Sequence, residues 1–125
     1  MIVDSSALVA ILRSEPDRAA FEEAIAHEVC KVSAATALET AIVVQPHRHE
    51  DVDQLLDEAQ IEVVAFDSAQ AKIARAAYAR FGKKSGSKAQ LNFGDCMAYA
   101  LAKALDEPLL FKGDDFTHTD ITQAR

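Results

Sequence analysis

Apolar residues along this chain follow two patterns, short continuous runs and longer stretches with helical spacing. Short apolar runs bounded by polar or turn residues are typical of buried strands. They predict strands at 1–4, 28–32, 61–66 and 108–111, with a further edge strand at 119–122. Because the run 61–66 is nearly continuous, we expect that strand to be covered on both faces.

Between these runs, apolar residues recur every three or four positions, which is typical of amphipathic helices. Serine or aspartate residues that favour helix N-termini precede several of these stretches. The predicted helices cover 5–12, 16–25, 34–45, 51–59, 68–81 and 92–105. Strands that alternate with helices predict one α/β domain over residues 1–125. We expect a three-layer sandwich with a mostly parallel central sheet of four to five strands.

Two of the predicted strands end in carboxylates. Asp4 follows the first strand, and Asp114 and Asp115 follow the strand at 108–111. Ligands of parallel sheets bind beyond the carboxyl ends of the strands, so these side chains are predicted to lie in a binding region. Asp4 could instead cap the following helix, and Gly-Asp-Asp could be an ordinary turn.

Two further carboxylates lie within apolar helices. The helix that carries Glu39 is apolar nearly all round, and we expect it to be buried. A buried Glu39 needs compensation, either by a salt bridge to a residue such as Arg13 or by a metal ion. Asp95 lies in the first turn of its helix, where the helix dipole alone favours a carboxylate. Asn92 could cap that helix and also contact substrate.

The joint occurrence of these carboxylates favours a metal site. Carboxylate oxygens are the ligands that Mg²⁺ and Mn²⁺ prefer, and metal-assisted phosphodiester cleavage uses them to position the ion and activate a water. The pattern therefore predicts a nuclease centre with one or two ions. The candidate catalytic and metal-binding residues are Asp4, Glu39, Asp95 and Asp114, with Asp115 as a further metal ligand.

Charge is unevenly distributed along the chain. The net charge of −7 argues against a protein that binds nucleic acid without specificity. No acid lies between Asp67 and Asp95, however, and a basic stripe in that interval could follow a phosphate backbone or could be a solvated helix face. Part of the stripe is a polar loop at 82–88, which we expect to be flexible. The candidate substrate-binding residues are Lys83, Lys84, Lys88 and Asn92.

Cysteine usage and hydropathy bear on the compartment. Cys30 and Cys96 lie in apolar sequence, which predicts two buried thiols in a reducing environment. No apolar run approaches the length of a membrane helix, and no charged leader is evident. We therefore expect a cytoplasmic protein without membrane contact.

Four stretches of the chain resemble the PIN-domain ribonucleases, and most closely the VapC-type toxins of prokaryotic toxin–antitoxin pairs. These stretches are 1–10, 33–40, 91–102 and 109–121, spread over essentially the whole chain. The specific motifs are Asn-Phe-Gly-Asp at 92–95 and Lys-Gly-Asp-Asp-Phe at 112–116.

The resemblance implies a PIN-like fold and a Mg²⁺- or Mn²⁺-dependent endoribonuclease. Its acidic quartet would be Asp4, Glu39, Asp95 and Asp114. Asp4 and Asp95 would be direct metal ligands with Ser6 as a supporting hydroxyl near Asp4, and Asp115 could take the role of Asp114. The implied partners are an RNA substrate, a cognate VapB-type antitoxin and a second copy of the chain, with DNA contacted only through the antitoxin.

Two other functions compete with this interpretation. A receiver-like signalling domain would bind Mg²⁺ at Asp4, accept phosphate at Asp67 and pair it with Lys112. Such a domain alternates single strands and helices, whereas two helices are predicted after the first strand, and it has no use for Glu39 or Asp95. A non-catalytic binding module with the same fold is the other alternative.

Overall fold

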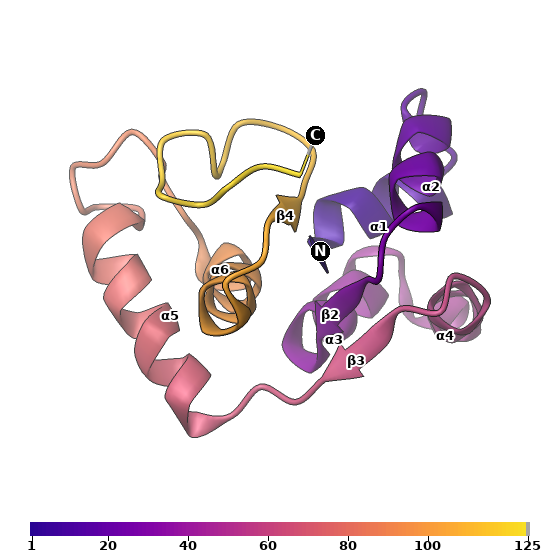
Figure 1. Ribbon diagram of the computed structural model, residues 1–125, viewed down its shortest axis with the longest axis horizontal. Coiled ribbons are helices and arrows are strands. Elements are labelled where there is room, and N and C mark those ends of the chain that lie inside the picture. Colours follow the sequence, from indigo (N-terminus) through magenta and orange to yellow (C-terminus); the bar gives the residue numbers. More distant parts are fainter. Residues whose placement is uncertain (125) are drawn as a thin grey trace.

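The computed structural model describes residues 1–124 and has a four-stranded sheet at its centre (Figure 1). The strands are β1 (Ile2–Val3), β2 (Lys31–Ser33), β3 (Glu62–Val64) and β4 (Leu109–Leu110), in the order β3-β2-β1-β4. All neighbouring strands are parallel. The predicted α/β class with a parallel central sheet is therefore confirmed.

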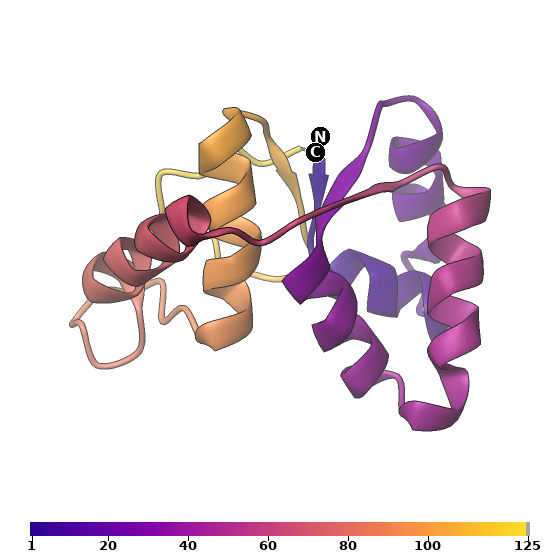
Figure 2. The same cartoon turned by 90° about the horizontal axis from the view of Figure 1, so that it is seen from below.

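Helices cover the sheet on both sides. In residues 1–124 they are α1 (Ser5–Leu12), α2 (Arg18–Ala26), α3 (Ala34–Val43), a 3₁₀ turn (Pro46–Arg48), α4 (His49–Glu58), α5 (Ser68–Phe81) and α6 (Phe93–Leu105). Figure 2 shows α5 and α6 on one side of the strands and α2 and α4 on the other, so the sheet is the middle layer of three. None of these helices is long and apolar enough to cross a membrane.

The strands divide the core into two apolar clusters. Successive residues of a strand point to opposite faces. Ile2 and Leu109 accordingly pack with the residues of α5 and α6, whereas Val3 and Leu110 pack with those of α1, α2 and α4. Both faces of β1 and β4 are thus buried, and the candidate site begins where these two strands end.

Two expectations about strands are wrong. β3 has a neighbour on one side only, and Val63 is 49% exposed, because β3 lies at the edge of the sheet where helices do not cover both faces. The expected strand at 119–122 does not form. Instead Leu109 makes an isolated bridge to Gln123, in which its N–H donates to Thr122 O at 2.9 Å and its carbonyl accepts from Ala124 N at 2.9 Å.

The expectation that α3 is buried nearly all round is also wrong. Leu38 and Ile42 are 63% and 66% exposed, whereas Thr36 and Thr40 are fully buried. The Thr40 hydroxyl donates to the Thr36 carbonyl at 2.8 Å, which satisfies its donor inside the helix. A threonine that satisfies its hydroxyl in this way can face the core, whereas Leu38 and Ile42 of the same helix face outward.

The polar loop between α5 and α6 contains several internal hydrogen bonds. Lys83 N donates to Leu91 O at 3.0 Å and Leu91 N donates to Phe81 O at 2.9 Å, which closes the base of the loop. The Ser85 hydroxyl donates to Gly82 O at 2.6 Å and fixes the first turn. The three lysines of the loop, Lys83, Lys84 and Lys88, are exposed.

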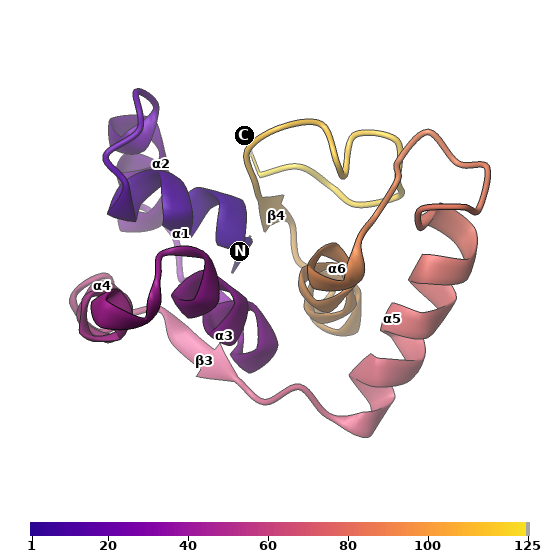
Figure 3. The same ribbon diagram turned by 180° about the vertical axis from the view of Figure 1, so that it is seen from behind.

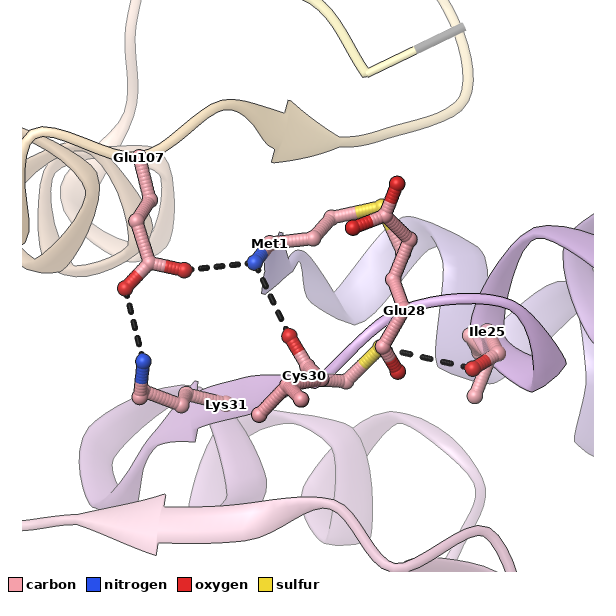
Figure 4. Close-up of polar contacts among 7 residues, drawn as sticks. Met1, Ile25, Glu28, Cys30, Lys31 and Glu107 are labelled. Carbon is pink, nitrogen blue, oxygen red and sulfur yellow. Dashed lines mark hydrogen bonds and ion pairs between the residues drawn. The ribbon is translucent and has the colours of Figure 1, made fainter.

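Ion pairs hold the amino ends of the strands together (Figure 4). Glu107, just before β4, accepts from the Met1 amino group at 2.5 Å and from Lys31 Nζ at 2.7 Å. These two partners, Lys31 first, lower the pKa of Glu107. The opposite, carboxyl ends of the strands carry the candidate acids.

Candidate functional site

Asp4 follows β1 directly and caps α1. Its N–H donates to Leu110 O at 2.9 Å, which fixes its backbone against β4. Its Oδ2 accepts from Ser6 N at 3.1 Å and from the Ser6 hydroxyl at 2.6 Å. Its Oδ1 is buried and accepts no hydrogen bond, and burial raises the pKa of Asp4. The predicted cap is therefore present, yet one carboxylate oxygen is left for another partner.

Asp95 lies in the first turn of α6 as predicted. Asn92 Oδ1 accepts from Asp95 N at 2.9 Å, and Asp95 Oδ2 accepts from Asn92 N at 2.9 Å, which together form a capping box. The Asp95 side chain is buried, and burial, followed by the charges of Asp115, Asp4 and Glu39, raises its pKa to about 7. The charged form of Asp95 is therefore unfavourable here, although the helix N-terminus and the hydrogen bond from Asn92 N stabilise it.

Glu39 reaches the site from α3. The alternative of a salt bridge to Arg13 is wrong, because Arg13 Nη2 donates to Val43 O at 2.8 Å instead. Glu39 Oε1 is buried without a hydrogen-bond partner. Burial, together with the charge of Asp4, raises the pKa of Glu39, and the Ser5 hydroxyl acts in the opposite direction.

Asp114 and Asp115 follow β4 in the turn that Gly113 begins. Gly113 has φ of +93°, which a residue with a side chain rarely adopts. The Asp114 carbonyl accepts from Thr117 N at 3.1 Å, so the predicted turn is present. Burial is the main cause of the raised pKa values of Asp4 and Asp95, and of the two turn residues it is the charge of Asp115 that adds to both. Asp115 is therefore the member of this pair whose charge acts on the other acids.

The donor set is suited to a divalent cation that keeps part of its water. Within residues 1–124, no three His, Cys, Asp or Glu side chains are gathered closely enough to enclose an ion by themselves. Mg²⁺ typically binds one or two carboxylates and retains several waters, so a closed cage is not required. Asp4 Oδ1 and Glu39 Oε1 are buried oxygens without partners, and both are hard ligands of the kind that Mg²⁺ and Mn²⁺ take.

One hydroxyl links the two strand ends. Ser6 Oγ donates to Asp4 Oδ2 and accepts from Lys112 N at 2.9 Å, so it joins the start of α1 to the loop that carries Asp115. Lys112 Nζ pairs with Glu15 at 2.8 Å and Asp17 at 3.1 Å. Sequence reasoning missed this second contact, because residues almost a hundred positions apart carry no local signal that they meet.

The geometry of a receiver domain is absent from the described residues. Asp67 follows the edge strand β3, and its side chain accepts from Gln70 N at 2.9 Å as the cap of α5. Lys112 follows β4 at the opposite edge of the sheet and binds Glu15 and Asp17. An aspartate and a lysine at opposite edges cannot act together on one phosphate.

The raised pKa of Asp95 gives a testable pH dependence. In metal-free protein the folded state keeps a proton to about pH 7, whereas an unfolded aspartate releases it near its ordinary 3.8. The free energy of unfolding should therefore fall as the pH rises from about 4 to 7, by on the order of 2 to 4 kcal/mol from this residue. Denaturant titrations in EDTA at pH 5 and pH 8 measure the larger part of this change, which falls above pH 5.

The variant Asp95→Asn isolates this contribution. It should lose much less stability between pH 5 and pH 8 than the wild type and should be more stable than the wild type at pH 8. Asp106→Asn is a matched control, because Asp106 is exposed at the far end of α6. Equal pH dependence in the wild type and Asp95→Asn would show that Asp95 does not hold the proton.

Comparison with known proteins places the chain in a family. The sequence profile of the PIN domain matches residues 1–121. VapC ribonuclease Mb0625 of Mycobacterium bovis is 50% identical over 129 residues, which cover 99% of this chain and 97% of that protein. Ribonuclease VapC30 of Mycobacterium tuberculosis is 47% identical over 126 residues, covering 97% of this chain and 95% of that protein.

A solved structure agrees with this assignment at the level of the fold. The crystal structure of Mycobacterium tuberculosis VapC20, a toxin that cleaves the sarcin–ricin loop, superposes with a TM-score of 0.75 over 99% of this chain and 98% of that chain, at 14% identity. The chain belongs to the PIN-domain family, and within that family to the VapC ribonucleases.

Proposed function

We propose that this protein is a Mg²⁺- or Mn²⁺-dependent endoribonuclease and the toxin of a toxin–antitoxin pair. The observation that carries the metal-dependent chemistry is the pair of buried, unpartnered oxygens, Asp4 Oδ1 and Glu39 Oε1, next to the buried Asp95. A charged carboxylate with a buried, unpartnered oxygen is unfavourable unless a proton or a cation compensates it. Names of relatives with about half their residues identical support the ribonuclease activity.

The four acids would hold the ion from four segments of the fold. Asp4 and Asp95 are the proposed direct ligands, and Glu39 and Asp115 complete the acidic set. We favour Asp115 over Asp114 because the charge of Asp115 acts on Asp4 and Asp95. Ser6 holds Asp4 Oδ2 and Asn92 N–H holds Asp95 Oδ2, so each side chain keeps its second oxygen for the ion. A bound Mg²⁺ polarises the phosphodiester and lowers the pKa of its water.

The loop between α5 and α6 is the proposed RNA-binding surface. Replacing Lys83, Lys84 and Lys88 together by glutamine should weaken RNA binding and reduce the slope of log K against log salt by up to about 2, since each contact to single-stranded phosphate contributes about 0.7. Filter binding between 50 and 300 mM KCl would measure the slope. Arg18→Gln, an exposed cation on α2, should leave the slope unchanged. An unchanged slope in the triple variant would exclude the loop from RNA binding.

Exposed apolar residues support the proposed protein partners, a VapB-type antitoxin and a second copy of the chain. Leu38 and Ile42 on α3 and Phe93 at the start of α6 are exposed. A groove of about 470 Å³ lies between α5 and α6, lined by Phe66 and Tyr78 among others. Contiguous exposed apolar surface is typical of interaction sites. Contacts to DNA would come from the antitoxin.

The two free cysteines agree with a cytoplasmic location, which we also propose. Cys30 and Cys96 are buried and unpaired, and burial raises the pKa of both thiols. A raised pKa keeps a thiol protonated and unreactive, so neither residue is a nucleophile. Unpaired cysteines are common in reducing compartments.

Cleavage of total cellular RNA by the purified chain tests the proposal. With Mg²⁺ or Mn²⁺, discrete fragments should appear, and EDTA should abolish them. Mapping the fragment ends would identify the RNA and the site of cleavage. Equal fragmentation with and without EDTA would contradict metal dependence, and no cleavage of any RNA with either metal would contradict the enzymatic function.

A further inference from the structure

Gly94, the second residue of α6, lies directly against the carboxylate of Glu39. A Cβ atom at position 94 would overlap Glu39 Oε2 and would lie 2.5 Å from Glu39 Cδ and 2.8 Å from Oε1. These distances are far shorter than any ordinary contact of a methyl group. The space that the missing side chain leaves is therefore the space that the Glu39 carboxylate occupies.

The backbone of Gly94 does not itself require glycine. Its φ lies outside the left-handed region, unlike those of Gly86 and Gly113. Glycine is a poor helix former, and alanine in its place normally stabilises a helix. A glycine at this position therefore needs another explanation, and the close approach of α3 to α6 through Glu39 provides it.

The approach brings Glu39 to the candidate metal site. Gly94 precedes Asp95, so the Glu39 carboxylate lies beside the N-terminal turn of α6. Its Oε1 is buried and accepts no hydrogen bond. We propose that Gly94 is a positioning residue for the metal-dependent reaction, because its missing side chain sets the place of the Glu39 carboxylate next to Asp95. This inference rests on the proposed function.

Because of this contact, Gly94→Ala should displace the Glu39 carboxylate without disturbing the packing of the two helices. The added methyl group meets the far end of a flexible side chain rather than backbone, so Glu39 can turn away without separating the two helices. We expect the Tm of metal-free Gly94→Ala to be equal to that of the wild type or higher. Since groups that orient metal ligands typically contribute 10- to 100-fold, we expect Mn²⁺ affinity and RNA cleavage each to fall by about 10-fold or more.

Shortening the side chain at position 39 should partly restore Mn²⁺ affinity in Gly94→Ala. A general packing defect would show no such rescue. Glu39→Asp withdraws the carboxylate by one methylene and relieves the overlap with Ala at position 94. Mn²⁺ affinity, measured by the EPR signal of free Mn²⁺, should be lower in Glu39→Asp than in the wild type. In Gly94→Ala/Glu39→Asp, however, it should be at least about 5-fold higher than the product of the two single effects predicts. Glu39→Gln, which keeps the length of glutamate, should give no such rescue.

The outcomes separate this inference from the proposed function. Wild-type Mn²⁺ affinity in Gly94→Ala, or independent effects of the two changes in the double variant, would overturn the positioning role and leave the metal site standing. A lower Tm with no rescue would assign Gly94 to helix packing and likewise overturn it. If the wild type neither binds Mn²⁺ nor cleaves RNA, the proposed function and the positioning role fall together.

Discussion

Replacing Asp95 by asparagine will reduce RNA cleavage by at least about 100-fold and leave the fold intact. The Asn92 N–H donates to Asp95 Oδ2, and an asparagine oxygen can accept the same hydrogen bond. The capping box, and with it the start of α6, is therefore retained. What the substitution removes is the negative charge that would hold the cation. Fragment yield per minute from total RNA with Mn²⁺ measures the loss.

A matched control separates this effect from a general loss of acidity on α6. Asp106 is exposed at the C-terminal cap of the same helix, with φ of +52°, a conformation that asparagine adopts readily. Asp106→Asn should cleave RNA at the wild-type rate. Wild-type cleavage by Asp95→Asn, or an equal loss in both variants, would contradict the role of Asp95.

Asp115→Asn should reduce cleavage by about 10- to 100-fold, and Asp114→Asn should change it by less than about 3-fold. The two residues are neighbours in one exposed turn, but only the charge of Asp115 acts on Asp4 and Asp95. Asp114 contributes its carbonyl to the turn, and asparagine keeps that carbonyl. Each variant is therefore the matched control of the other.

Initial cleavage rates at saturating Mn²⁺ and far-ultraviolet circular dichroism of both variants measure this difference. A greater loss in Asp114→Asn would place the fourth acid at position 114. The acidic set would then be the one that the family resemblance alone implies.

Periodicity predicted the layers of this fold better than it predicted which faces are exposed. The runs around Ile2 and Leu109 are strands because each alternates its side chains between two apolar clusters. The same reasoning failed for α3, where Thr40 faces the core by donating to its own helix and Ile42 faces outward. A sequence pattern counts apolar residues but does not say which of them find a partner.

The acids of the site were predictable as residue types at strand ends and helix starts, but not as a spatial arrangement. Asp4 proved to be both a helix cap and a carboxylate with a free buried oxygen, because its two oxygens have different surroundings. The choice between Asp114 and Asp115 depends on the direction of a turn. The contact of Gly94 with Glu39 joins two helices far apart in the sequence, and only the folded chain shows it.

Direct titration of Mn²⁺ into the wild type and Asp95→Asn, followed by EPR, tests the central claim that these carboxylates form a metal centre. We expect the wild type to bind Mn²⁺ at pH 8 and to bind it more weakly at pH 6. Below its pKa of about 7, Asp95 holds a proton that the metal ion must displace. Asp95→Asn should bind at least about 10-fold more weakly and should lose most of this pH dependence. Equal affinity of both proteins at both pH values would contradict the account.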